Sequence, residues 1–299
     1  MNDRPDSLLP QRVLLATDLS ARHDRPLDRA TQLAHEWLAE LMVVTAREGP
    51  ATPEEVSSWL GGGNSVHAFE LAARAELARE FAASGLTPSL RVVEADVIDG
   101  ILSVAATVPD SVVVIGASPD QSFQQFVLGA KAVRLAQGLI KGVGQPLLVV
   151  RQRTRASYSR ILVANDFSDG ARRALETAVR LFPGRPITLF HALEDSVPAL
   201  ADGDAALVQA ALERSAQWIT RCELPADIVP RITVVIGHGA VHDAVADYAA
   251  RQAVELVVLS VRHHSAMARV FIGSRSDDLL LHLACDTLLV PAGDGHDLD

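Results

Sequence analysis

The segment RVLLATDLS, residues Arg12–Ser20, occurs again in the second half of the chain as RILVANDFS, residues Arg160–Ser168. Each copy is an apolar, strand-like run that ends in Asp, one further residue and Ser, so Asp18 corresponds to Asp166. Self-similarity of this kind indicates a duplicated structural unit.

The residues after each copy have the spacing of an amphipathic helix, with apolar side chains three and four positions apart on one face. These positions are Leu27, Ala30, Leu33, Ala34 and Trp37 in the first half, and Ala171, Ala174, Leu175, Ala178 and Leu181 in the second. A longer helix is expected farther along each half. Its buried face carries Val66, Phe69, Ala73, Leu77 and Phe81 in the first half, and Leu207, Ala211 and Trp218 in the second.

Apolar runs alternate with these helices in the same order in both halves. They are ELMVVTA, SLRVVEAD, SVVVIGAS and PLLVVR in the first half, and PITLFHA, RITVVIGH, ELVVLSVR and TLLVPA in the second. Such runs, rich in Val, Ile and Leu, are typical of a parallel sheet covered on both faces. The sequence therefore predicts an α/β fold of two doubly wound, parallel five-stranded sheets in tandem, similar to nucleotide-binding α/β sandwiches.

The polar segment RQRTRASYSR, 151–160, separates the two copies. It predicts one domain over 1–152 and a second over 158–299, which agrees with about 150 residues per domain. The segment is too short to act as a long flexible tether.

Composition restricts the function classes. Hydrophobic residues make up 48% of the chain and the formal net charge is −10, which is typical of a globular protein and argues against nucleic acid as a partner. Cys222 and Cys285 have no metal-ligand spacing. The first eleven residues do not resemble a secretion signal, and no apolar stretch could span a bilayer, so we expect a cytoplasmic protein without membrane contact.

Ligands of doubly wound sheets collect at the carboxyl ends of the strands. Asp18 and Asp166, the residues after MVV and TLF, and the loops after VVVIG and LVVLS are therefore expected to surround one pocket in each half.

The pattern ILVANDFSDGARRALETAVRL, followed by PITLFHALED and later by GSRSDDLLLHLACDTLLVP, resembles the universal stress protein family. The resemblance covers essentially the whole chain, once per half. In many members it implies ATP binding through Gly, two residues, Gly, nine residues, Gly and then Ser or Thr, with an Asp after the first strand near the adenosine. Glycines let phosphates approach backbone N–H groups, and the last pair opens a helix whose N-terminus favours an anion.

In the first half this pattern falls on Gly116, Pro119, Gly129 and Ala130. Pro119 has no N–H to donate and Ala130 has no hydroxyl, so half of the pattern is lost.

In the second half the pattern falls on Ser260, His263, Gly273 and Ser274, so the last pair is intact and both upstream glycines are replaced. The segment from Ser260 to Arg275 is basic and contains no acid, and arginine or protonated histidine can replace lost backbone donors. Binding of ATP or another phosphate anion is therefore expected in the second half if it occurs at all.

Each of these residues also has a purely structural interpretation. Asp18 and Asp166 either contact a nucleoside or cap the turn and helix that follow. Gly129 and Gly273 either admit a phosphate or relieve strain where a loop enters a helix.

Histidines at the strand ends of the second half suggest a different site, formed by His191, His238, His242 and His263. Three imidazoles near the Asp166 carboxylate could hold zinc or a similar divalent ion. The alternative is that His191 is a residue common in the resembling family and that His263 is a solvated loop residue.

The interpretation that we favour is a non-enzymatic stress-response or regulatory protein with degenerate nucleotide-binding motifs. Alternatives are an ATP- or anion-binding switch in the second domain, and a metal-binding protein or metal-dependent enzyme that uses the histidines. The family resemblance also implies that the last strands, PLLVV and TLLV, pair across a two-fold axis, so that the domains form an intramolecular pseudo-dimer. A homodimer of the whole chain, the regulatory partner protein and enzymatic activity stay open.

Overall fold

A computed structural model describes residues 9–17, 24–47, 66–82, 84–117, 135, 137–139, 142, 144–193, 201–261 and 283–292. Its first half contains β1 (Arg12–Ala16), α1 (Asp24–Trp37), β2 (Glu40–Arg47), α3 (Val66–Glu80), β3 (Ser89–Glu94), α4 (Val97–Thr107), β4 (Ser111–Gly116) and β5 (Leu147–Val150). The second half contains β6 (Ile161–Ala164), α6 (Asp169–Leu181), β7 (Ile187–Leu193), α7 (Ala201–Ile219), a 3-10 turn at Val229–Arg231, β8 (Ile232–His238), α8 (Val241–Arg251), β9 (Leu256–Val261) and β10 (Asp286–Pro291).

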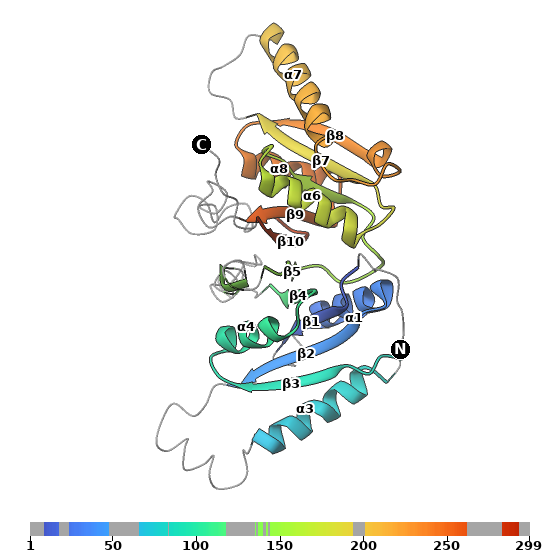
Figure 1. The fold of residues 1–299 in the computed structure, drawn as a ribbon, viewed down its shortest axis with the longest axis vertical. Coiled ribbons are helices and arrows are strands. Elements are labelled where there is room, and N and C mark those ends of the chain that lie inside the picture. The colour runs from blue at the N-terminus through green and yellow to red at the C-terminus, as the bar shows by residue number, and fades with distance from the viewer. Residues whose placement is uncertain are drawn as a thin grey trace.

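All of the described strands belong to one ten-stranded sheet with the order β3-β2-β1-β4-β5-β10-β9-β6-β7-β8. Within each half the neighbouring strands are parallel, and the two halves have the same order of strands. The predicted fold class, a doubly wound α/β unit present twice, is confirmed. Figure 1 shows the two repeats end to end, with β5 and β10 between them.

The repeats meet where β5 and β10 pair antiparallel, with Leu148 opposite Leu288. These strands carry the two segments, PLLVV and TLLV, that the family resemblance suggested as partners. Because β5 is fully buried and β10 is buried from Asp286 to Val290, the sheet continues from one repeat into the other without an exposed edge.

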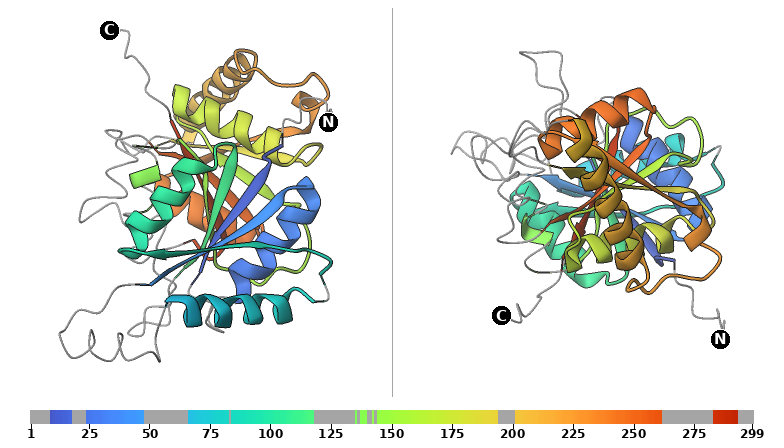
Figure 2. Two further views of the ribbon diagram at one scale, coloured as in Figure 1. Left: turned by 60° about the horizontal axis from the view of Figure 1, so that its bottom comes forward. Right: turned by 90° about the horizontal axis from the view of Figure 1, so that it is seen from above.

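Helices cover both faces of the twisted sheet, as the two views of Figure 2 show. Under α1, α3, α6 and α7 lies one hydrophobic cluster, which includes Trp37 from the first repeat and Phe182 from the second. The other cluster lies under α4 and α8 and includes Ile101 and Val245. Each cluster contains residues of both repeats, so the core is continuous through the junction.

The predicted helix faces are mostly correct. In α6, the expected residues Ala171, Ala174, Leu175, Ala178 and Leu181 are all buried, and in α1 Leu33, Ala34 and Trp37 are too. The prediction for Leu207 is wrong, because its side chain is 55% exposed. Helix α7 packs against the sheet through its second half, where Ala211 and Trp218 are buried, whereas Ala205, Ala206 and Leu207 are exposed.

Candidate functional site

The first loop at the carboxyl edge of the second repeat runs from Asn165 to Ser168, between β6 and α6. Asp166 is exposed, and its Oδ1 accepts a hydrogen bond from the backbone N–H of Ser168 at 3.0 Å. Ser168 is the N-cap of α6, since its Oγ accepts from Ala171 N at 3.1 Å. One carboxylate oxygen of Asp166 therefore has the structural role: it stabilises the turn that precedes the capped helix.

The buried Asn165 stabilises the same loop through hydrogen bonds. It was not among the site residues expected from the sequence. It is 4% exposed, and its Oδ1 accepts from Phe167 N at 2.8 Å. Its carbonyl oxygen lies 2.8 Å from His191 Nδ1. The turn also holds Phe167 at a φ of 64°, a left-handed conformation that is uncommon for an aromatic residue.

An aromatic cluster covers this turn. The ring of Phe167 lies 4.4 Å from that of His191 and 6.3 Å from that of Trp218, while the Arg214 guanidinium stands 4.2 Å above it. Trp218 Nε1 donates to the Phe167 carbonyl at 3.1 Å. Aromatic and cation–π contacts of this kind stabilise the strained turn. Sequence analysis identified Trp218 only as a core position of α7.

Ser260, at the end of β9, occupies the first glycine position of the ATP pattern. It lies opposite Val290 of β10, as Gly116 of β4 lies opposite Val150 of β5, so the two residues are structurally equivalent. Ser260 is 8% exposed and packs under the first turn of α6, where a Cβ added at Gly170 would overlap its Oγ. The hydroxyl therefore fills space against α6, whereas Gly116 has no side chain.

Three of the four histidines predicted as metal ligands are described, and they lie on three different elements. His191 is half-buried on β7, His238 is exposed at the end of β8, and His242 Nε2 lies 3.4 Å from Asp243 Oδ2 in α8. Among the residues described, no group of three or more His, Cys, Asp or Glu side chains could hold a metal ion. His263, the fourth candidate ligand, lies outside the described residues, as do Asp18, Gly129, Gly273 and Ser274.

Comparison with known proteins identifies the family. The universal stress protein profile matches the chain twice, over residues 10–151 and 157–291. The chain belongs to the universal stress protein family. No curated protein sequence matches it. Within the part of the chain that the structure covers, no helix combines the length and apolarity needed to cross a membrane.

Two solved structures resemble the whole of this universal stress protein. A universal stress protein from Archaeoglobus fulgidus DSM 4304 superposes with a TM-score of 0.62 at 17% identity, covering 96% of this chain and 100% of its own. A putative universal stress protein from Pseudomonas aeruginosa UCBPP-PA14 gives a TM-score of 0.65 at 14% identity, covering 96% and 95%. At these identities the likeness establishes the fold.

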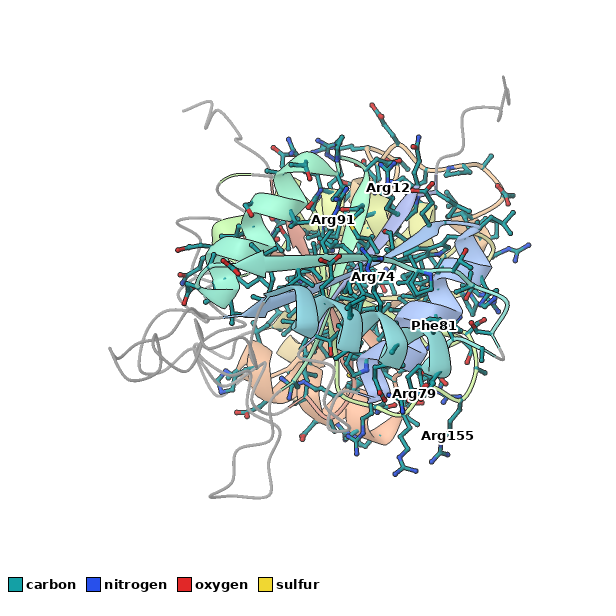
Figure 3. The ribbon with its side chains drawn as sticks, turned by 90° about the horizontal axis from the view of Figure 1, so that it is seen from below. Arg12, Arg74, Arg79, Phe81, Arg91 and Arg155 are labelled. Atoms are coloured by element: carbon teal, nitrogen blue, oxygen red, sulfur yellow. The ribbon has the colours of Figure 1, made fainter. Side chains whose placement is uncertain are left out.

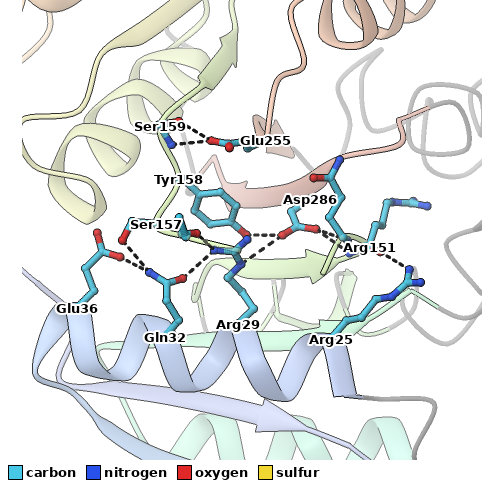
Figure 4. A network of polar contacts seen from close by, with 12 residues as sticks. Arg25, Arg29, Gln32, Glu36, Arg151, Ser157, Tyr158, Ser159, Glu255 and Asp286 are labelled. Atoms are coloured by element: carbon cyan, nitrogen blue, oxygen red, sulfur yellow. Dashed lines mark hydrogen bonds and ion pairs between the residues drawn. The ribbon is translucent and has the colours of Figure 1, made fainter. Parts of the chain in front are cut away.

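A polar network centred on Asp286 lies between the repeats of this universal stress protein (Figure 4). Its side chain, at the start of β10, is fully buried. Oδ1 accepts from the backbone N–H groups of Arg151 at 2.7 Å and Gln152 at 2.9 Å, and Oδ2 accepts from Tyr158 Oη at 2.6 Å. Arg29 of α1 completes the site, with Nε 3.5 Å from Oδ2 and its guanidinium 3.9 Å from the Tyr158 ring.

This network holds the 151–160 segment against both repeats. Arg25 Nη1 donates to the carbonyl of Arg151 at 2.6 Å, and Arg29 Nη1 donates to that of Ala156 at 3.0 Å. Arg151 and Tyr158 are both buried. The segment between the repeats is therefore a packed part of the junction.

Burial dominates the electrostatics at this junction. It raises the pKa of Asp286, although hydrogen bonds from Gln152 N and Tyr158 Oη and the charge of Arg29 lower it. Burial likewise raises the pKa of Tyr158 well above its ordinary value and that of the neighbouring Cys285 thiol to about 12. Tyr158 and Cys285 are therefore neutral at physiological pH.

Proposed function

We propose that this chain is a non-enzymatic, cytoplasmic stress-response or regulatory protein whose repeats act as one fused pseudo-dimer and whose nucleotide-binding motifs are degenerate. The proposed domains are residues 1–152 and 158–299. Membership of the universal stress protein family supports the general role. The observation that carries the finer proposal is the placement of Ser260.

In the family pattern the position of Ser260 is a glycine, whose lack of a side chain leaves room for a ligand next to the backbone. Here the serine side chain packs against Gly170 at the entrance to α6. The serine side chain takes up the space beside α6 that a glycine leaves empty, so a nucleotide phosphate has less room at this strand end. The sequence changes at Pro119 and Ala130 support the same loss in the first repeat.

The fused pseudo-dimer is supported by the β5–β10 pairing and the buried Asp286 network. A regulator that works by contact needs a surface of fixed shape, and two repeats that share one sheet and both hydrophobic clusters provide it. The proposed output is therefore recognition by a partner protein and not turnover of a substrate.

Calorimetric titration of the full chain with Mg-ATP tests the loss of nucleotide binding. The wild-type chain is expected to give no saturable signal, whereas the double variant Pro119→Gly, Ala130→Ser is expected to gain first-repeat binding. Pro109→Gly is the matched control, because this exposed proline lies in the loop before β4, at the opposite edge of the sheet. Saturable binding by the wild-type chain would contradict the proposal and support an ATP-binding switch.

A further inference from the structure

Strand β8 forms one end of the ten-stranded sheet, and no described strand pairs with its outer side. Its sequence, ITVVIGH, contains no Asp, Glu, Lys or Arg. Thr233 and His238 are exposed and the residues between them are half-buried. An uncharged edge of this kind is a template for pairing with another strand.

The opposite end of the sheet is different. Strand β3, SLRVVE, carries Arg91 and Glu94 within the edge itself. Figure 3, seen from this end, shows Arg74, Arg79 and Arg91 around α3 and β3. Charged side chains on an edge strand oppose pairing with a further chain. Of the two end strands of the sheet, β8 is therefore the one whose edge favours pairing with a further strand, and no described strand occupies that edge.

The backbone groups available on β8 follow from its pairing with β7. Gly239 N donates to Leu193 O at 3.0 Å, so residue 239 faces β7. Because successive residues of a strand direct their N–H and C=O groups to opposite sides, residues 233, 235 and 237 also face β7. The N–H and C=O groups of Ile232, Val234, Ile236 and His238 are directed to the open edge.

A second copy of β8 fits these groups when it runs antiparallel. With Val235 opposite itself, Val234 of each copy pairs with Ile236 of the other, and Ile232 pairs with His238. Every outward-directed N–H and C=O of the strand then has a partner. The junction of β5 with β10 is also an antiparallel pairing, between strands of the two repeats.

Charge complementarity also favours a second copy. The exposed Arg231 precedes β8, and Asp243, whose side chain is 70% exposed, lies in the first turn of α8 just after it. An antiparallel arrangement places Arg231 of one copy, whose Nη1 donates to Gly184 O of its own repeat at 2.6 Å, at the end of the strand where Asp243 of the second copy lies. The same symmetry creates this opposite-charge contact twice, and no like charges meet along the strand.

We propose that β8 is a dimerisation edge, through which two copies of this chain pair antiparallel and join their sheets into one. The dimer is closed, because the contact uses the same strand of both copies and leaves the charged β3 edges outside. This interface is independent of the nucleotide-binding question.

Sedimentation velocity of the full chain over a dilution series tests this. The wild-type chain is expected to form a species of twice its 31.9 kDa mass that dissociates on dilution. Ile236→Pro removes one outward N–H from each copy and leaves the pairing with β7 intact. Loss of those two hydrogen bonds is expected to raise the dimer dissociation constant by roughly 30-fold.

Val92→Pro is the matched control. Val92 is a β-branched residue of β3 whose N–H is directed away from β2, so this variant also removes one N–H from an edge strand. It is expected to dimerise normally. Thr233→Lys is a second test variant, which adds a charge at an exposed position and keeps every backbone donor. It is also expected to weaken the dimer, with an unchanged melting temperature as the measure of its fold. A wild-type chain that stays monomeric, an Ile236→Pro variant that dimerises normally, or loss of the dimer only in Val92→Pro would overturn the proposal.

Discussion

Replacing Tyr158 with Phe removes one hydroxyl from the junction between the repeats. The ring keeps its edge-to-face contact with Phe182, whose centroid is 5.5 Å away, and its contact with the Arg29 guanidinium at 3.9 Å. Asp286 Oδ2 loses the donor at 2.6 Å and keeps the Arg29 charge at 3.5 Å. The substitution therefore isolates one buried hydrogen bond to a carboxylate.

A hydrogen bond to a charged group contributes about 2 kcal/mol to folding, so we expect Tyr158→Phe to lower the free energy of unfolding by about that amount. For a chain of 299 residues this corresponds to a fall in Tm of about 3 °C. Urea unfolding and calorimetry measure both quantities. Tyr248, the other of the two tyrosines, packs on Phe190, and Tyr248→Phe is the matched control, with an expected loss below about 0.5 kcal/mol.

The effect of Tyr158→Phe should depend on pH in a definite direction. The Tyr158 hydrogen bond lowers the pKa of Asp286, so it stabilises the charged carboxylate more than the protonated one. The difference between wild type and variant is therefore fully present above the native pKa of Asp286, which burial holds above 3.8, and shrinks as the pH falls through it. Equal losses for Tyr158→Phe and Tyr248→Phe at neutral pH would refute the central role of Asp286.

Three further substitutions or treatments test other parts of the structure. Gly170→Ala should lower the free energy of unfolding by about 1–3 kcal/mol in thermal unfolding, because the added Cβ overlaps Ser260 Oγ. Adding Ser260→Gly to the same chain should restore most of this loss. If it does not, the strain lies elsewhere. Burial raises the pKa of Glu255, but hydrogen bonds from Ser159 and Arg160 outweigh it and lower that pKa below 4.5. The loss of stability in Glu255→Gln should therefore be present above pH 4.5 and vanish as the pH falls through the pKa of Glu255 in the folded chain. A loss of stability that grows in acid would contradict this. Burial raises the pKa of Cys222 to about 11 and of Cys285 to about 12, so both thiols should react with a disulfide reagent slowly in the native chain and rapidly in urea, and a fast native reaction would show that a thiol is accessible.

The repeated pattern of apolar runs was sufficient to predict the fold. The helical stripe of α6 and the alternation of strands and helices in each half rest on periodicity, which burial on one face imposes directly on the sequence. Leu207 was misassigned because periodicity gives the side of a helix and not how far the sheet extends beneath it. The exposed side chain lies on the part of α7 that extends beyond its packing contacts.

The junction could not be predicted in the same way. Asp286 and Tyr158 are 128 residues apart, and each occurs in a segment whose local pattern indicates nothing about a buried carboxylate. Their contact depends on the antiparallel pairing of β5 with β10, which only the three-dimensional arrangement specifies. At the carboxyl edge, Asp166 was recognised from the repeat and Ser260 from the family's ATP pattern, whereas the roles of Asn165 and Phe167 depend on a left-handed turn that no spacing indicates.

Native mass spectrometry of the purified full chain, combined with elemental analysis, tests the proposed function most directly. The proposal of a regulator with degenerate nucleotide motifs predicts protein mass alone, without nucleotide and without stoichiometric metal. Bound nucleotide at one equivalent would contradict the degenerate-motif proposal, and stoichiometric zinc that is lost in His263→Ala would establish the metal site in its place.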